Sequence, residues 1–142
     1  MPSLSWTLDS TLESVDAAEE SVRVFAQQAG FEESDWYFIG LAAREILVNA
    51  IKHGNRFDPA KKVGLHLSTD NRQLIVEIED QGEGFRIEDV PDPCLPENLG
   101  RDSGRGLILA KGIMDEFRIE SGSAGGTHVR MSKSLPNAGL HT

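Results

Sequence analysis

The sequence has few of the residues on which several classes of protein depend. It contains one cysteine, Cys94, which excludes an internal disulfide and a multi-cysteine zinc site. It has no run of about 18 apolar residues, so no membrane-spanning helix is expected. The amino terminus lacks the basic region and apolar stretch of a secretion signal. We therefore expect a cytoplasmic protein.

Basic residues are also in the minority. Lys and Arg number 14 against 23 Asp and Glu, which gives a formal net charge of −9. Binding to nucleic acid or to an anionic membrane surface needs a basic surface, so neither is expected. If the chain binds an anionic ligand, the positive field must be local. It can come from backbone N–H groups, a helix amino terminus or a metal ion.

Hydrophobic periodicity predicts the fold class. The chain has 142 residues, 39% of them apolar, which suits one domain with a single core. Alternation of apolar and polar residues predicts strands at about 4–8, 62–69, 73–79, 116–120 and 127–133, and three- and four-residue steps predict helices at about 11–29, 34–53 and 104–115. This order predicts an α+β two-layer sandwich, with helices on one face of a largely antiparallel mixed sheet.

Capping residues and loops complete this outline. Asp9 or Ser10 is expected to cap the first helix, and Gly30 to end it. A single domain is expected over 1–134, followed by a flexible tail at 135–142. Residues 86–103 contain several prolines and no periodicity, and a loop of this length is usually a functional lid or disordered.

The second predicted helix carries two polar residues that point the same way. Glu45 and Asn49 are four residues apart and share a helix face, and His53 lies one further turn along it. An amide oxygen at Asn49 can coordinate a hard cation such as magnesium. A carboxylate at Glu45 can orient or deprotonate an attacking hydroxyl. The alternative is a solvated polar stripe opposite the apolar face.

A glycine turn, Asp80-x-Gly82-x-Gly84, directly follows a predicted strand. One interpretation is a hairpin or bulge turn. The other is a buried aspartate that accepts the exocyclic amine of adenine, with glycines that let the backbone approach the base and sugar. A calcium loop is excluded, because Gly82 and Gly84 occupy positions that need oxygen ligands.

Two further segments could face an anionic ligand. Gly104-Arg105-Gly106-Leu107 opens a predicted helix, whose free N–H groups can bind an anion, although a flexible hinge fits as well. Thr127 follows Gly125-Gly126 and either places a hydroxyl near Asp80 or simply begins a strand. Rossmann and Walker motifs are absent, since Leu109 stands where the third Rossmann glycine belongs and no Gly-Lys pair occurs.

In this order the three motifs resemble the nucleotide site of the GHKL ATPases, the superfamily of gyrase, heat-shock chaperones, histidine kinases and mismatch-repair proteins. The resemblance covers about 4–133. Within that superfamily the chain looks most like the bacterial anti-sigma-factor serine/threonine kinases. It shares the size of one bare ATPase domain, the sequence Asn-Ala-x-Lys-His-Gly at 49–54, and a strand and long helix before that motif.

The resemblance implies roles for these residues. ATP and Mg²⁺ would be the cofactors, with Asn49 holding the magnesium, Asp80 the adenine, Glu45 acting as the catalytic base and residues 86–103 forming the ATP lid. The remaining nucleotide contacts would come from Lys52, His53, Gly82, Gly84, Gly104, Arg105, Gly106, Leu107 and Thr127.

The resemblance also implies partners. The chain would phosphorylate a serine or threonine of an antagonist protein and sequester a sigma factor, with a homodimer as a candidate assembly. A complete histidine kinase is not expected, because no upstream helix carries a phospho-accepting histidine. The alternative is a nucleotide-responsive binding module of the same fold with little phosphoryl transfer, which would have no need of a base at Glu45.

Overall fold

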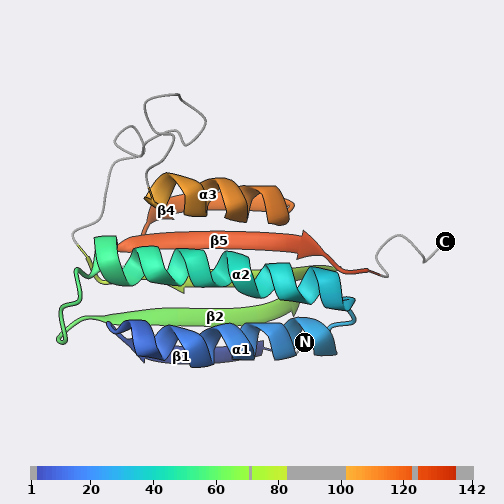
Figure 1. Cartoon of the computed structure of the whole chain (residues 1–142), viewed down its shortest axis with the longest axis horizontal. Helices are drawn as coiled ribbons and strands as arrows, with labels where there is room; N and C mark the ends of the chain where they lie inside the picture. The colour runs from blue at the N-terminus through green and yellow to red at the C-terminus, as the bar shows by residue number, and fades with distance from the viewer. Residues whose placement is uncertain (1–2, 71, 83–101, 123–124, 137–142) are drawn as a thin grey trace.

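Five strands and three α-helices form the part of the chain that the computed structural model describes, residues 3–70, 72–82, 102–122 and 125–136, with backbone alone at 102–105 (Figure 1). In chain order the elements are β1 (Ser3–Asp9), α1 (Leu12–Gln28), α2 (Glu33–Asn49), the π-helical turn η1 (Ala50–Gly54), β2 (Lys62–Asp70), β3 (Gln73–Glu79), α3 (Asp102–Ile113), β4 (Glu116–Ser121) and β5 (Thr127–Ser134).

Local sequence sets both ends of α1. Thr11 is the N-cap, with extended backbone and a hydroxyl that accepts the Ser14 N–H at 3.4 Å. The predicted caps, Asp9 and Ser10, are therefore wrong. At the other end Gly30 has a φ of +105°, and the Phe31 N–H donates to the Ala26 carbonyl at 3.2 Å. This is a Schellman motif, and it confirms that Gly30 ends the helix.

The sheet is antiparallel throughout, in the order β1-β2-β3-β5-β4. The central strand β3 pairs with β2 on one side and with β5 on the other. The register between β3 and β5 pairs Glu79 with His128, which places Asp80, the residue after β3, close to the start of β5. The Asp80 N–H donates to the Thr127 carbonyl at 3.0 Å.

All three helices cover one face of the sheet (Figure 1). The core lies between the two layers, and its fully buried large side chains include Val15, Val22, Ile39, Leu47, Ile51, Val63, Leu65, Leu67, Leu74, Val76, Ile78 and Met131. The predicted α+β two-layer class is confirmed, although the sheet is wholly antiparallel among these strands and not mixed. Within the described residues, no helix is both long and apolar enough to cross a membrane.

Two boundaries differ from the prediction. The second helix was expected to run to about 53, but regular α-helix ends at Asn49 and a π-helical turn continues to Gly54. The third helix begins at Asp102, two residues before the predicted start. Both differences lie at segments that the sequence assigned to the nucleotide site.

We predict that Leu67→Ala lowers the free energy of unfolding by about 2–5 kcal/mol, the usual effect of truncating a leucine that is fully buried. Leu67 is 0% exposed, while Leu4, its register partner on β1, is 45% exposed. Leu4→Ala is therefore the matched control, with an expected loss of about 0.5 kcal/mol or less. Urea denaturation measures both, and equal losses would contradict this account of the core.

Candidate functional site

The Asp80 carboxylate is buried at the end of the central strand. Only 4% of the surface of Asp80 is exposed. Oδ1 accepts two backbone N–H groups, from Gly82 at 2.9 Å and from Thr127 at 3.1 Å. Within the described part of the motif, the chain bends at Gly82 around this buried acid. Thr127 reaches this acid through its backbone.

Three glycines let the backbone close around Asp80. A Cβ at Gly54 would overlap the Asp80 carboxylate, and a Cβ at Gly126 would overlap the Asp80 carbonyl. A Cβ at Gly82 would overlap the Gly54 carbonyl. Any other residue at these positions would have to push the segments apart. Gly54 and Gly126 were missed as site residues, because the sequence marks them only as the ends of a helix and of a turn.

Burial raises the pKa of the Asp80 carboxyl above its ordinary value, because the charged form loses water. The N–H groups of Gly82 and Thr127 act in the opposite direction, since they stabilise the carboxylate. An acid kept in such surroundings at a strand end is typical of a functional site rather than of a stabilising one. A ligand that donates to this carboxylate would replace part of the lost hydration.

A second cluster lies where α2 faces α3. A Cβ on Gly106 would lie 3.0 Å from Glu45 Oε2 and 3.6 Å from Asn49 Nδ2. The polar face predicted for Glu45 and Asn49 is therefore not a stripe open to solvent, since both residues are half-buried and turned towards α3. This arrangement brings the first and third motifs together.

The donor set at Asn49 suits magnesium bound jointly with a phosphate. Among the described residues there is no group of three or more His, Cys, Asp or Glu side chains that could hold a metal by itself. Magnesium is commonly held by one or two protein oxygens, with phosphate oxygens and water completing the octahedron. The amide oxygen of Asn49 could supply such a ligand.

Three other predicted contact residues lie in η1 and α3. Lys52 is half-buried and His53 exposed, both within η1, so the α-helical spacing that aligned His53 with Asn49 does not hold there. Leu107 is partly buried and packs against the core. Whether these residues touch a nucleotide stays a prediction.

The remaining predicted residues are described only in part. Gly84 lies outside the described residues, as do 86–101 of the expected lid. Gly104 and Arg105 form part of the first turn of α3, for which only the backbone is described. Because α3 starts at Asp102, its unpaired N–H groups belong to 102–105 and not to Gly106.

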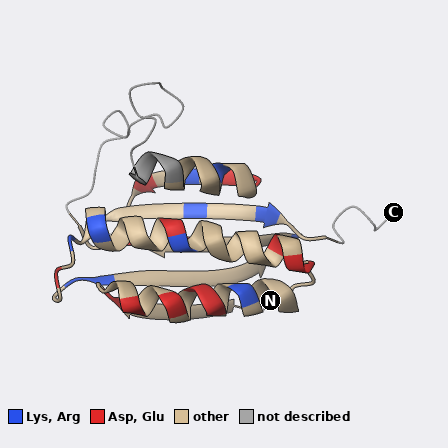
Figure 2. Cartoon of the chain, viewed as in Figure 1, with Lys and Arg blue, Asp and Glu red and all other residues tan. Residues whose placement is uncertain are grey.

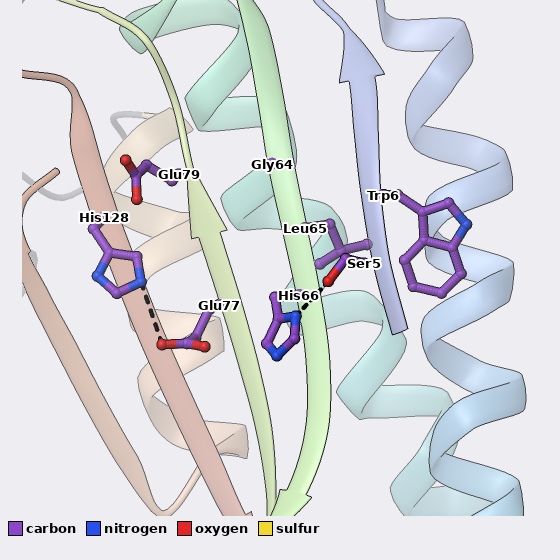
Figure 3. A pocket seen from close by; sticks show the side chains of 8 residues that line it. All are labelled: Ser5, Trp6, Gly64, Leu65, His66, Glu77, Glu79 and His128. Atoms are coloured by element: carbon purple, nitrogen blue, oxygen red, sulfur yellow. Dashed lines mark hydrogen bonds and ion pairs between the residues drawn. The ribbon is translucent and has the colours of Figure 1, made fainter. Parts of the chain in front are cut away.

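A separate hollow of about 280 Å³ lies on the sheet face that the helices leave open (Figure 3). Its lining residues are Ser5, Trp6, Gly64, Leu65, His66, Glu77, Glu79 and His128. Ser5 Oγ and His66 Nδ1 form a hydrogen bond, and His128 Nε2 lies 3.4 Å from Glu77 Oε1. None of the predicted site residues lines this hollow, so the two sites are distinct.

Comparison with known proteins gives a family match over most of the chain. The sequence model of the family described as histidine kinase-like ATPase domain matches residues 8–133. That range includes the Asp80 turn, the Glu45–Asn49 face and the α3 segment.

Curated relatives match at modest identity. The serine-protein kinase RsbW of Bacillus licheniformis is 29% identical over 116 residues, which cover 78% of this chain and 71% of the relative. An anti-sigma F factor of Clostridium novyi is 30% identical over 124 residues, which cover 83% of this chain and 84% of the relative.

Solved structures share the fold. The RsbU and RsbW domains of a Mycobacterium tuberculosis protein align with a TM-score of 0.68 and 23% identity, covering 95% of this chain and 33% of that one. The present chain thus spans about a third of the length of that solved chain. The mycobacterial sensor histidine kinase MprB aligns with a TM-score of 0.55 and 22% identity, covering 92% and 97%.

We predict that Asp80→Asn makes the ligand-free protein more stable at neutral pH. The folded protein holds the Asp80 proton more tightly than the unfolded chain does, because burial raises the pKa. This group therefore favours folding below its unfolded pKa and disfavours it as pH rises through the folded pKa. The variant removes that loss.

Urea unfolding between pH 4 and pH 7 measures the effect, with Asp70→Asn as control, since Asp70 is exposed at the far end of the sheet. The stability of Asp80→Asn should fall less than that of the wild type as pH rises. An Asp80→Asn protein that is less stable than wild type at pH 7 would contradict the prediction.

Proposed function

The chain belongs to the histidine kinase-like ATPase domain family, and from that membership we propose that it is an ATP-binding serine/threonine protein kinase of the anti-sigma-factor type. It binds ATP with magnesium, phosphorylates an antagonist protein and sequesters a sigma factor. Relatives named as a serine-protein kinase and as anti-sigma F factors support this assignment.

The observation that carries the proposal is that one continuous segment reaches both clusters. Helix α2 presents Glu45 and Asn49 towards Gly106, and the η1 turn that follows brings Gly54 against Asp80. An extended ligand with a base at one end and phosphates at the other could contact both. ATP has that form.

The adenine end is assigned to Asp80. An ionised carboxylate accepts hydrogen bonds and donates none, so it selects a ligand that presents an N–H group. The exocyclic amine of adenine does so. Gly82 adds backbone that can come close to the base, because it carries no side chain.

The phosphate end is assigned to the face shared by α2 and α3. Asn49 would hold the magnesium, which supplies positive charge to the phosphates when bound. Glu45 would orient the partner's hydroxyl and take its proton as the oxygen attacks the γ-phosphorus and ADP leaves. The N–H groups at the start of α3 would face the phosphates.

Surface charge bears on the choice of partner. Glu13, Asp16 and Glu20 are exposed along α1, and Figure 2 colours several positions of this helix as acidic. The net charge of −9 fits the proposal of protein partners and no nucleic acid. A homodimer remains part of the proposal.

Asp80→Asn is expected to weaken the binding of Mg²⁺-ADP by about ten- to a hundredfold, because a hydrogen bond to a charged acceptor contributes about 1.5–3 kcal/mol. Titration calorimetry measures the dissociation constant. Asp70→Asn is the matched control and should bind like the wild type. Equal affinities for Asp80→Asn and wild type would remove Asp80 from the adenine site.

Glu45→Gln is expected to lower phosphoryl transfer at least about a hundredfold, since a general base typically contributes about 10²–10⁴-fold. Its affinity for Mg²⁺-ADP should stay within about threefold of wild type, because the proposed base does not hold the nucleotide. Asn49→Ala should lose both, because the metal ligand is gone. Transfer of labelled phosphate to the antagonist encoded by a neighbouring gene measures the rate.

Glu33→Gln, in the first turn of the same helix, is the control for that experiment. A Glu45→Gln protein that transfers phosphate at the wild-type rate would refute the role of Glu45. A wild-type protein that binds nucleotide and transfers nothing would instead favour the alternative, a nucleotide-responsive binding module.

A further inference from the structure

Asn55 is a buried amide directly after the η1 turn, and only 1% of its surface is exposed. Its Nδ2 donates to the Ser10 hydroxyl and to the Lys62 carbonyl, both at 3.0 Å. Its Oδ1 accepts the backbone N–H of Gln81 at 2.8 Å. The side chain therefore uses both of its donors and its acceptor.

These bonds join three segments that are distant in sequence. Ser10 connects β1 to α1, Lys62 begins β2, and Gln81 follows the buried Asp80. The network has a second tie, since Gln81 Oε1 accepts the Lys62 N–H at 2.6 Å. Asn55 thus joins the end of the long α2–η1 segment to the start of β2 and to the residue after Asp80, at the end of the central strand.

The bond to Gln81 is placed where the site is most tightly packed. Asn55 follows Gly54, whose backbone lies against the Asp80 carboxylate. Gln81 stands between Asp80 and Gly82, and Gly82 packs on the Gly54 carbonyl. The hydrogen bond between Asn55 and Gln81 therefore lies directly beside the contact that Gly54 makes with Asp80 and Gly82. It links the segment that follows Asn49 to the turn that carries Asp80.

The backbone around Asn55 is held in an unusual conformation. The Asn55 N–H donates to the Ala50 carbonyl at 2.8 Å, the wide bond that makes η1 π-helical. Arg56 and Phe57 then have φ angles of 52° and 60°, in the left-handed region. Residues other than glycine seldom adopt this region, and such strained backbone is often found at functional sites.

We infer that Asn55 is a positioning residue for the nucleotide site, which holds the adenine-facing Asp80 turn in register with the metal-facing end of α2. This inference rests on the proposed function. It assigns to Asn55 no contact with the nucleotide. Its loss should misplace the two clusters relative to each other and weaken the binding of a ligand that spans both.

The test compares Asn55→Ala with Ser10→Ala. Ser10→Ala removes the bond from Asn55 Nδ2 and a second bond from the Ser10 hydroxyl to the Lys61 carbonyl, but leaves the Gln81 N–H with its acceptor. A merely structural Asn55 predicts that both variants lose thermal stability and neither loses affinity. A positioning role predicts that only Asn55→Ala loses affinity.

The measurement is titration calorimetry with Mg²⁺-ADP at a temperature at which circular dichroism shows both variants folded. Asn55→Ala is expected to raise the dissociation constant at least about tenfold, the effect of leaving the part-buried Gln81 N–H without its acceptor. Ser10→Ala is expected to stay within about twofold while its melting temperature falls. Affinity within about twofold for both, or an equal loss in both, overturns the inference.

If Asn55→Ala does not fold, the wild-type protein carries the test through amide hydrogen exchange. The Gln81 N–H donates to Asn55 Oδ1 and the Gly82 N–H to Asp80 Oδ1. If Asn55 holds the Asp80 turn in place, Mg²⁺-ADP is expected to slow exchange of both N–H groups together. Slower exchange at Gly82 alone overturns the inference. A wild-type protein that does not bind Mg²⁺-ADP at all refutes the proposed function, whereas equal binding by wild type and Asn55→Ala refutes the role of Asn55 only.

Discussion

The site depends on the close approach of three backbone segments to the Asp80 carboxylate. Burial of that charge is unfavourable, and the N–H groups of Gly82 and Thr127 offset only part of the loss. The approach is possible because Gly54 and Gly126 carry no side chain. The end of η1, the turn after β3 and the start of β5 therefore meet at one acid, and a ligand that donates to it would offset more of the loss.

This constraint explains the irregular end of α2. A regular α-helix to Gly54 would continue straight along the axis of α2. The π-helical turn instead widens the last turn of the helix, and the left-handed residues Arg56 and Phe57 then redirect the chain towards β2. Asn55 then donates to the Lys62 carbonyl at the start of β2 and accepts the Gln81 N–H next to Asp80. Burial of the Asp80 charge thus destabilises the folded protein, while the hydrogen bonds of Asn55 and the apolar core stabilise it.

Much of the fold could be predicted because the apolar pattern is regular. The five strands and three helices lie where alternation and three- and four-residue steps placed them, and Gly30 ends α1 as its backbone freedom suggests. The errors occur where local patterns compete. Asp9, Ser10 and Thr11 can all cap a helix, and packing selects Thr11, since Ser10 is drawn into the buried network around Asn55. The α-helical pattern was expected to continue to about 53, and nothing in the residues Ala50–Gly54 indicated the π-helical turn that the structure contains.

The sequence by itself determined the layer order of this protein, the identity of its acidic and amide side chains, and the shared helix face of Glu45 and Asn49, since each follows from spacing along one element. Tertiary structure alone decided which of those side chains meet. Gly54, Asn55 and Gly126 look like the ends of a helix and of a turn in the sequence. They become parts of the site only because the fold brings Gly54 and Gly126 to Asp80 and Asn55 to Gln81, each more than twenty positions away. Such contacts depend on register and on the path of the intervening chain, which local patterns do not encode.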